Sequence, residues 1–584
     1  MTHGIGSYAF NSVDTADEAH TQEGRINEFN FYNSSLRAEN SSALRIANAA
    51  QRLLFDRSTV TGCIAGTDCE TQGVAVFIGD VDDNNVYMLD ASLTAKNQSL
   101  ITGDVVMTEH PDGAKFDMYL NEGSQLTGAV NNLASDATAL SLNIDSSSLW
   151  NVRGDSNLNT LRNGGSVSFM SPSSAGEFKT VSVGAYEGGG QLSINTALGG
   201  DDSSTDKLVV TESASGATKV IVNNAGGQGA QTEQGIEIVS VNPASDATFI
   251  LANRASAGAY DYTLDQHAPG SWRLNSGPSN VRPEGGAYLA NHINSAAMFM
   301  QQLYDRGQIK NDASDVKESS AAWARIDGWH NDSSAADALD IRSNVIRVQV
   351  GVDLWRKSYD EGSAVAGLMT GYGRSDTHSD NGHTGYSAKS RVDGYSLGSY
   401  ATWFGHDDKL TGPYADFWLL HGWYDNDINQ GKESYNSRGW IYSAEGGYGF
   451  SFGQSGGRSL IVTPQLQLSY NSLRTDDHRD VNGTKVYGGT DDELFTRAGI
   501  RVSAAEGAFR PFIEANWLNG DTTNTIQYGD RVIRDDSPKN RYEFKLGWQG
   551  NLSDAWKTWG DVGGQWGKNG YRGVGGQVGL RYEW

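Results

Sequence analysis

The sequence predicts an all-β protein of two parts joined by one helix: a parallel β-solenoid, followed by a transmembrane β-barrel of twelve strands. Three observations support this fold class. Short β-branched runs separated by Gly, Asn, Asp and Ser fill residues 73–264. One stripe of helical period follows at 286–306, and beyond residue 311 apolar and polar residues alternate strictly in long segments. Alternation over about ten residues is typical of a barrel strand, whereas shorter runs need stacked neighbours to bury an apolar face.

Length and composition narrow the functional classes. The 584 residues include 71 glycines but only 10 prolines, and the formal charge is −25. Such an acidic chain does not fit nucleic-acid binding, because neutralising phosphates requires a basic face. The mean hydropathy is −0.49, and no uninterrupted apolar run is long enough for a transmembrane helix. This result does not exclude a transmembrane β-barrel, because only every second residue of a barrel strand is apolar.

The solenoid is expected at residues 71–283. Its short runs alternate, as in Leu140, Leu142 and Ile144, which are separated by Ser and Asn. Strands this short bury their apolar faces by stacking rung on rung. An immunoglobulin-like sandwich is the alternative, and it is disfavoured because no Cys-Trp-Cys spacing appears. Residues 1–70 have no assignable organisation, except that 41–55 show Leu and Ala at helical spacing and predict one short helix.

A second helix is expected at residues 284–309. Apolar residues recur there at i, i+3 and i+4, and Gly307 follows as a stop. The stripe contains Leu289, Ile293, Ala297, Met300 and Leu303. Trp150 and Trp272 precede this helix, whereas all the other tryptophans follow it. A domain boundary is therefore expected near residue 283.

The barrel is expected at residues 310–584. Alternating segments with aromatic residues near their ends indicate strands whose Trp and Tyr lie at the lipid interfaces. The candidate strands number twelve, an even count as antiparallel closure needs, at 320–326, 343–355, 363–373, 391–404, 414–424, 438–452, 459–471, 494–503, 509–518, 541–551, 555–567 and 572–584. A soluble β-sandwich is disfavoured, because it would rarely carry so many tryptophans.

Alternation also predicts which side chains face lipid and which face the lumen. In the last strand the lipid-facing set is Val578, Leu580, Tyr582 and Trp584. Charged residues of the opposite parity are expected to make the lumen hydrophilic, namely Arg347, Asp353, Glu445, Glu514, Glu543, Lys545, Arg581 and Glu583. A lumen of this size is wide enough for a helix. The helix at 284–309 is therefore expected to lie in the pore.

Three stretches resemble the classical monomeric autotransporters of type V secretion, specifically the AIDA-type adhesins and their pertactin-like relatives. The first extends from SLWNVRGDSNLNTL at 148–161 to FILANRASAGAYDYTL at 249–264. The second is WRL at 272–274, followed by VRPEGGAYLANHINSAAMF at 281–299. The third is the terminal GLRYEW at 579–584. Together they span residues 130–584, while residues 1–70 match no family.

The resemblance implies a right-handed β-helix passenger at 71–283, with an autochaperone region at 130–270. It further implies a linker helix in the pore and a translocator barrel in a Gram-negative outer membrane. The implied partners are outer-membrane lipid, unidentified ligands on host or bacterial cells, and the barrel-assembly machinery, which would recognise the terminal aromatic strand. The implied function is translocation and surface display of the chain's own passenger, for adhesion, autoaggregation or biofilm formation.

Three alternatives remain open. The chain could be the translocator part of an autotransporter whose protease or esterase domain lies upstream of Met1, or a truncated remnant without function. The first twenty residues show neither a basic nor an apolar stretch of a signal peptide, which raises the question of a longer reading frame. A stand-alone porin is the third alternative, and the linker helix argues against it.

Motif evidence for chemistry is absent. HExxH and P-loop patterns do not occur, and the sequence predicts no enzyme activity, no cofactor and no metal site. Cys63 and Cys69 lie six residues apart in a polar stretch and predict a small disulfide, as in an oxidising compartment. The tripeptide Arg153-Gly154-Asp155 is a weak candidate for cell attachment, because three residues specify little.

Overall fold

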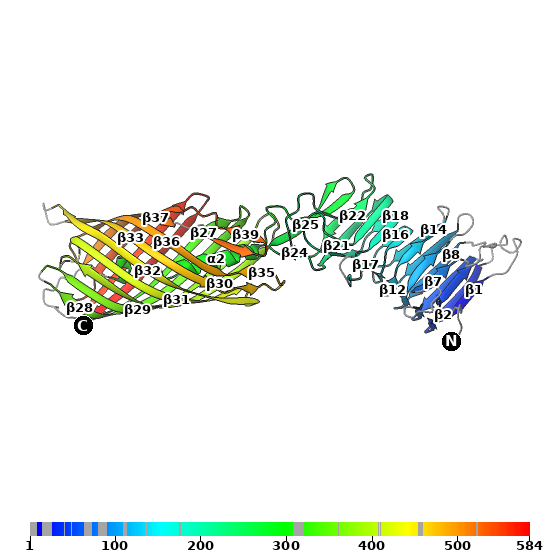
Figure 1. Cartoon of the computed structure of the whole chain (residues 1–584), viewed down its shortest axis with the longest axis horizontal. Coiled ribbons are helices and arrows are strands. Elements are labelled where there is room, and N and C mark those ends of the chain that lie inside the picture. Colours follow the sequence, from blue (N-terminus) through cyan, green and yellow to red (C-terminus); the bar gives the residue numbers. More distant parts are fainter. Residues whose placement is uncertain are drawn as a thin grey trace. The chain divides into compact units, whose positions relative to one another are not determined.

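The computed structural model describes residues 9–13, 26–39, 41–47, 50–63, 73–79, 90–108, 114–134, 138–173, 177–307, 320–359, 361–406, 408, 410–453, 459–520 and 524–584. The chain divides into two compact units, one of Met1–Ala257 with Asp261–Gly277 and one of Gly258–Tyr260 with Pro278–Trp584. Figure 1 colours the first unit from blue to green and the second from green to red. No helix among the described residues has both the length and the apolar character that a membrane crossing requires.

The first unit is a solenoid of parallel strands stacked in register. One sheet bends around two of its sides and contains β1 (Phe10–Val13), β2 (Ile26–Tyr32), β4 (Leu44–Ala47), β5 (Ala50–Asp56), β7 (Val74–Ile78), β8 (Ala91–Lys96), β10 (Asp104–Met107), β11 (Lys115–Leu120), β13 (Val130–Asn132), β14 (Ala139–Ile144), β16 (Ser156–Asn163), β18 (Thr180–Gly188), β20 (Lys207–Ser215), β22 (Ile236–Val241), β24 (Ala255–Ala257), β25 (Tyr260–Ala268) and β26 (Ser271–Asn275). The last two pair antiparallel, and β26 also pairs antiparallel with β22.

A second sheet of nine strands forms the third side. It contains β3 (Ser35–Arg37), β6 (Thr59–Thr61), β9 (Leu100–Thr102), β12 (Gln125–Gly128), β15 (Leu149–Val152), β17 (Ser166–Phe169), β19 (Gln191–Thr196), β21 (Ala217–Asn224) and β23 (Thr248–Leu251). Apolar side chains stack from rung to rung inside the coil. Leu126 aligns with Trp150, and Trp150 with Val167, all fully buried. The Trp150 indole donates to the Gly128 carbonyl at 2.9 Å, so this large side chain is buried with its polar atom satisfied.

The helix expected at residues 41–55 is wrong, because this segment forms β4 and β5. Arg52 is exposed, whereas Leu53 and Phe55 on either side of Leu54 are buried, which is the alternation of a strand. Leu53 aligns with Phe29 in the preceding rung and Leu93 in the following one. Stacking thus overrides a helical spacing of Leu and Ala that arose by coincidence. The described strands before residue 71 belong to the same solenoid.

The second unit contains a closed antiparallel barrel of twelve strands, as predicted. The strands are β27 (Ala321–Ala335), β28 (Leu339–Ser358), β29 (Ser363–Asn381), β30 (Ser387–Phe404), β31 (Gly412–Ile428), β32 (Glu433–Phe452), β33 (Leu460–Thr475), β36 (Gly489–Ala504), β37 (Phe509–Gly520), β40 (Asn540–Asn551), β41 (Trp556–Gly567) and β42 (Arg572–Glu583). Each predicted segment falls on one of them, and β27 pairs with β42 to close the barrel. Many strands are longer than the roughly ten residues that cross a bilayer, so they extend beyond it.

Exposed aromatic side chains gather near both ends of the barrel's outer face. At the end where β27 begins and β42 finishes, here the terminal end, these include Trp355, Trp403, Trp556 and Trp584. At the opposite end they include Trp423, Trp440, Trp517 and Trp566. Apolar residues such as Leu368 and Leu397 are exposed between the two belts. This is the outer face of a barrel that lies in lipid.

Two helical segments precede the barrel strands, α2 (Pro283–Ala297) and the short 3₁₀ helix η1 (Leu303–Arg306). A further four-stranded sheet, here the loop sheet, is formed by β34 (His478–Arg479), β35 (Lys485–Tyr487), β38 (Thr525–Tyr528) and β39 (Arg531–Arg534). It joins the loop between β33 and β36 with the loop between β37 and β40, at the end opposite the chain terminus.

Candidate functional site: the occupied lumen of the barrel

Helix α2 lies among the barrel strands (Figure 1) and packs mainly against the inner faces of β29 and β30. Pro283 occupies its first turn, where the missing N–H costs nothing. Gly286 faces the wall so closely that a Cβ atom there would lie 2.4 Å from Ser379 Oγ. The absence of a side chain at this position therefore lets the helix approach the wall.

Polar side chains of the helix form hydrogen bonds to the wall. Asn294 Nδ2 donates to Ser343 Oγ and Thr377 Oγ1, each at 3.2 Å. Ser295 Oγ donates to Asn426 Oδ1 at 3.5 Å. The inner face of a barrel is lined by the polar half of each alternating strand, so a helix that rests against it needs hydrogen-bonding groups.

The predicted stripe residues therefore divide between two surroundings. Leu289 and Leu303 are buried. Ile293, Ala297 and Met300 line a cavity of about 320 Å³, between the helix and the walls of β27, β36 and β40. The expected helix at 284–309 was also too long, because α2 ends at Ala297. Met300 lies in the segment between α2 and η1, and Leu303 begins η1.

Just after α2 the chain fills an apolar part of the lumen. Met298 and Phe299 are buried in one cluster with Val392, Tyr424 and other inward side chains of the wall. Gly373 and Gly394 make room for Met298, since Cβ atoms there would lie 2.7 and 2.4 Å from its sulfur. Inward glycines and an apolar cluster were not predicted, because alternation alone marks the inward positions without showing what fills the space between them.

The turn η1 is tied to the wall by buried charges. Arg306 forms an ion pair with Asp416, which also accepts a hydrogen bond from Thr402 Oγ1 at 2.6 Å. Asp305 lies 3.3 Å from Arg325 and accepts from Gln577 Nε2 at 2.7 Å. Because these partners come from β27, β30, β31 and β42, the turn connects opposite sides of the barrel.

Gly307 ends η1 in a left-handed conformation with φ of 61°. A Cβ atom at this position would lie 2.2 Å from the Trp559 ring. Glycine is therefore required here both for the backbone conformation and for the space.

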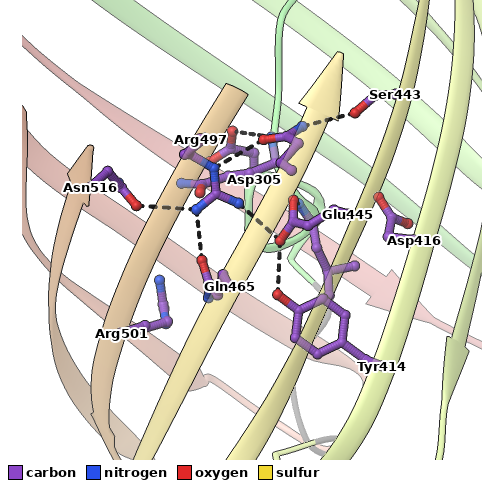
Figure 2. Close-up of polar contacts among 12 residues, drawn as sticks. Asp305, Tyr414, Asp416, Ser443, Glu445, Gln465, Arg497, Arg501 and Asn516 are labelled. Carbon is purple, nitrogen blue, oxygen red and sulfur yellow. Dashed lines mark hydrogen bonds and ion pairs between the residues drawn. The ribbon is translucent and has the colours of Figure 1, made fainter. Parts of the chain in front are cut away.

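Glu445 and Arg497 lie at the centre of a polar network of the wall (Figure 2). They form an ion pair at 3.0 Å. Glu445 accepts from the Tyr414 hydroxyl at 2.9 Å and from the backbone N–H of Leu303 at 3.1 Å. Arg497 donates to Gln465 Oε1 at 2.7 Å and also lies near Glu514. Each buried charge in this network is paired, as a stable interior requires.

The entrance at the loop-sheet end is held by a second set of contacts around the start of α2. Arg282, almost fully buried, donates to Asp480 Oδ2 at 2.7 Å, and the Tyr528 hydroxyl donates to the same oxygen at 2.6 Å. Burial raises the pKa of Tyr528 well above its ordinary value. His478 stacks on Tyr435 with ring centroids 4.1 Å apart, and burial lowers the pKa of His478. The loop sheet thus fixes the N-terminal end of α2.

The charged residues expected in the lumen do face inward. Arg581 pairs with Asp353, and Glu583 lies 2.8 Å from Lys557 and 3.0 Å from Arg581. Similar pairs join Arg347 to Asp327 at 2.5 Å and Lys545 to Glu543 at 3.5 Å. The sequence did not single out Arg282, Arg306 or Asp416. The one feature of the sequence that could have indicated Arg282 and Arg306 is their position at the two ends of the predicted helix.

The proposed assembly residues Val578, Leu580, Tyr582 and Trp584 are all exposed on the outer face, with Tyr582 and Trp584 stacked at 5.7 Å. Their recognition by an assembly machinery stays a prediction.

The other candidates lie in the solenoid. Cys63 is buried and disulfide-bonded, while Cys69 lies outside the described residues, so the pairing of these two cysteines stays a prediction. Arg153 contacts Asp104 at 2.9 Å, and Asp155 Oδ1 accepts from the Thr180 N–H at 2.8 Å. Both ends of the Arg-Gly-Asp tripeptide are therefore engaged within the solenoid, and its use for attachment is untested. No group of three or more His, Cys, Asp or Glu in the described ranges is arranged to hold a metal ion.

Comparisons with known proteins agree with this architecture. The family described as "Autotransporter beta-domain" matches residues 322–563, and "Autochaperone Domain Type 1" matches residues 156–264. Uncharacterized protein YdeU of Escherichia coli K12 is 32% identical over 452 residues, which cover 69% of this chain and 97% of YdeU. Autotransporter adhesin AIDA-I of Escherichia coli is 32% identical over 445 residues, which cover 70% of this chain and 34% of AIDA-I.

The chain thus spans nearly all of YdeU but about a third of AIDA-I and of a further relative, YuaQ of Escherichia coli K12. Among solved structures, the transport unit of AIDA-I is 27% identical with a TM-score of 0.47, and the match covers 52% of this chain and 99% of that unit.

Proposed function

Because this chain belongs to the autotransporter family, we propose that its barrel carries the solenoid through the outer membrane and that the solenoid then mediates adhesion at the cell surface. The observation that supports translocation most directly is the path of the chain. The segment that follows the solenoid enters the lumen as α2 and continues as η1. The η1 turn lies near the end of the barrel where β27 begins. A passenger that had crossed through this barrel would leave its connecting segment in this position.

The solenoid is suited to act as a displayed surface. Its apolar side chains are inside the coil, as in the stack of Leu126, Trp150 and Val167. On its outside, polar side chains align from rung to rung, such as the half-exposed pair Thr127 and Asn151. Repeated polar ladders on a rod provide many equivalent contacts, and many weak contacts together give strong attachment.

Adhesion is also supported by the names of the relatives, among them "Autotransporter adhesin AIDA-I" and "Adhesin BmaC autotransporter" of Brucella suis. We propose no enzyme activity for the described residues. The proposal concerns binding alone: contact of the solenoid with other bacteria or with host surfaces.

The test is to express the chain behind a cleavable export leader in Escherichia coli and to compare intact cells before and after surface proteolysis. We expect that protease removes the solenoid from intact cells, while the barrel stays in the outer membrane. Sedimentation of the cells and their attachment to glass and epithelial layers should fall to the level of cells without the protein. Unchanged attachment after complete removal of the solenoid would contradict the adhesive role, and a solenoid that protease reaches only after cell lysis would contradict display.

A further inference from the structure

The outer face of the barrel carries charged side chains above the aromatic belt at the loop-sheet end. On β28, β29 and β30 the arginines at this level have acidic partners. Arg342 pairs with Asp380, Arg374 lies 3.4 Å from Asp376, and Arg391 lies 2.8 Å from the same carboxylate. These charges are neutralised within the protein, so they need no outside partner.

The neighbouring pair on β32 and β33 differs. Arg438 and Arg474 are directly opposite each other in the antiparallel register, and both are exposed on the outer face. Among the residues whose side chains the structure describes, neither guanidinium has a carboxylate at ion-pair distance. Like charges directly opposite on neighbouring strands repel each other. The arrangement therefore has a cost, which an anion between the two arginines would remove.

Acidic residues also lie in this region. Asp492 accepts a hydrogen bond from the Tyr470 hydroxyl, and Asp477 lies 3.0 Å from Lys485. Asp425 on β31 and Asp476, which follows β33, form no ion pair with either arginine. The local acidic groups thus leave the two guanidinium groups available.

Aromatic rings flank the arginine pair: Trp423 on β31 is directly opposite Arg438 in the register, and the other rings lie on the membrane side of the pair. Trp440 stacks with Tyr442 at 6.2 Å, and Tyr442 lies 6.4 Å from Tyr470. His421 extends this cluster, with its ring 4.7 Å from Trp440 and 4.3 Å from Trp423. Trp and Tyr rings mark the level of the lipid headgroups. The two arginines therefore lie just outside the hydrocarbon, at the height of headgroup phosphates.

We propose that Arg438 and Arg474 together bind a phosphate of a lipid headgroup in the outer leaflet, with the aromatic cluster beneath them against the same lipid. The planar guanidinium presents paired N–H donors that match phosphate oxygens. The negative charge of the lipid phosphate would offset the repulsion between the two arginines. This inference rests on the outer-membrane location of the barrel and is independent of the adhesive role of the solenoid.

The experiment uses the full chain purified in a phosphate-free detergent, with lipid A as the probe, a glucosamine-disaccharide lipid that carries phosphate groups. Thermal unfolding and native mass spectrometry are measured for the natural chain and for Arg438→Gln/Arg474→Gln. The matched control is Arg342→Gln/Arg391→Gln, which removes two outward arginines that already have acidic partners. Dephosphorylated lipid A and inorganic phosphate provide two further arms.

We expect lipid A to raise the unfolding temperature of the natural chain and of the control. The affinity of Arg438→Gln/Arg474→Gln for lipid A should be lower by a factor of about ten or more. Without lipid, that variant should unfold at the same or a higher temperature than the natural chain, because repulsion is removed. Dephosphorylated lipid A should bind alike to all three proteins. Equal retention of lipid A by natural chain and variant would overturn the proposal. Inorganic phosphate that reproduces the whole stabilisation would also overturn it, by showing an anion site without a lipid. Surface display of the solenoid should be unchanged in every variant, which separates this test from that of the proposed function.

Discussion

Arg306 and Asp416 form an ion pair in which both side chains are completely shielded from solvent. The pair joins η1, at the C-terminal end of the segment that fills the lumen, to β31 in the wall. A buried pair of this kind contributes little net stability compared with two apolar residues, but breaking it leaves an uncompensated charge. It therefore acts mainly to fix one position of the segment inside the barrel.

Replacing Arg306 by Met should lower the free energy of unfolding of the barrel by about 3–5 kcal/mol, because Asp416 stays buried without its partner. The double change Arg306→Met/Asp416→Leu should recover most of this loss. The measurement is thermal unfolding in detergent. Arg342→Met is the control, since its pair with Asp380 is partly exposed and should be worth about 1 kcal/mol or less. Equal losses in the single and double variants would argue against the pair as the cause.

Replacing Gly286 by Ala should displace α2 from the wall, because the new Cβ atom would lie 2.4 Å from Ser379 Oγ. The pore should then show a higher ionic conductance in planar bilayers. Adding Ser379→Ala should return the conductance toward that of the natural chain. A Cβ atom at Gly382 would meet no other atom within 4 Å, so Gly382→Ala is the matched control and should change nothing. A conductance equal to that of the control would mean that the helix does not press on this part of the wall.

Replacing Leu208 by Asp should make the solenoid sensitive to protease on intact cells while the barrel still inserts. Leu208 is 1% exposed and stacks between Val181 and Val239, so an unpaired charge there is strongly unfavourable. The neighbouring change Val209→Asp is the control, because Val209 aligns with Ser182 and Ser240 on the more exposed side. If both variants resist protease like the natural chain, this part of the solenoid does not stabilise the rest.

Acidification should loosen the loop sheet. Burial lowers the pKa of His478, so the packed state binds fewer protons than a state in which this ring is exposed. Stability supplied by the neutral ring is therefore present at neutral pH and is lost as pH falls below about 6.5, the ordinary histidine pKa.

Hydrogen exchange of β38 and β39 at pH 7.5 and pH 5 measures this effect. The variant His478→Phe keeps a ring against Tyr435 but cannot take up a proton. It should lose the pH dependence of exchange in the loop sheet. The same pH dependence in the variant would assign the effect to another group.

Replacing Trp584 by Asp should reduce the yield of folded barrel in the outer membrane more than Phe509→Asp does. Both side chains are exposed aromatics on the outer face at the terminal end, so the cost of a charge near lipid is similar. An additional loss at Trp584 would come from recognition of the last strand during assembly. Cell fractionation followed by heat-modified gel mobility gives the yields, and equal losses would show that the terminal position has no special role.

Alternation along the sequence was sufficient to predict all twelve barrel strands and the inward or outward side of their residues. It succeeded because each strand has lipid on one side and a polar lumen on the other, so that the period is visible residue by residue. The solenoid was predicted from β-branched runs for a similar reason. The same reasoning failed at residues 41–55, where Leu53 and Phe55 stack on neighbouring rungs that local spacing does not reveal.

The lumen was predicted only in outline. The sequence indicated a helix with an apolar packing face, but it did not indicate that Asn294 and Ser295 would hydrogen-bond to the wall. An amphipathic stripe shows which side of a helix is apolar, but it does not show that Leu289 is buried while Ile293 and Ala297 line a cavity. The pairing of Arg306 with Asp416 could not be predicted, because it joins residues 110 positions apart whose closeness depends on the closed barrel.

The central claim is that α2 occupies the lumen against the wall of β28–β31, and one crosslinking measurement tests it most directly. Ser295 Oγ lies 3.5 Å from Asn426 Oδ1, so Ser295→Cys/Asn426→Cys should form a disulfide when cells carrying the full chain in the outer membrane are mildly oxidised. The control Ser295→Cys/Ser333→Cys places the second thiol on β27, which borders the cavity on the other side of the helix. We predict efficient crosslinking of the first pair and little of the second. Crosslinking of neither pair, or of the second in preference to the first, would contradict the position of the helix on which the account depends.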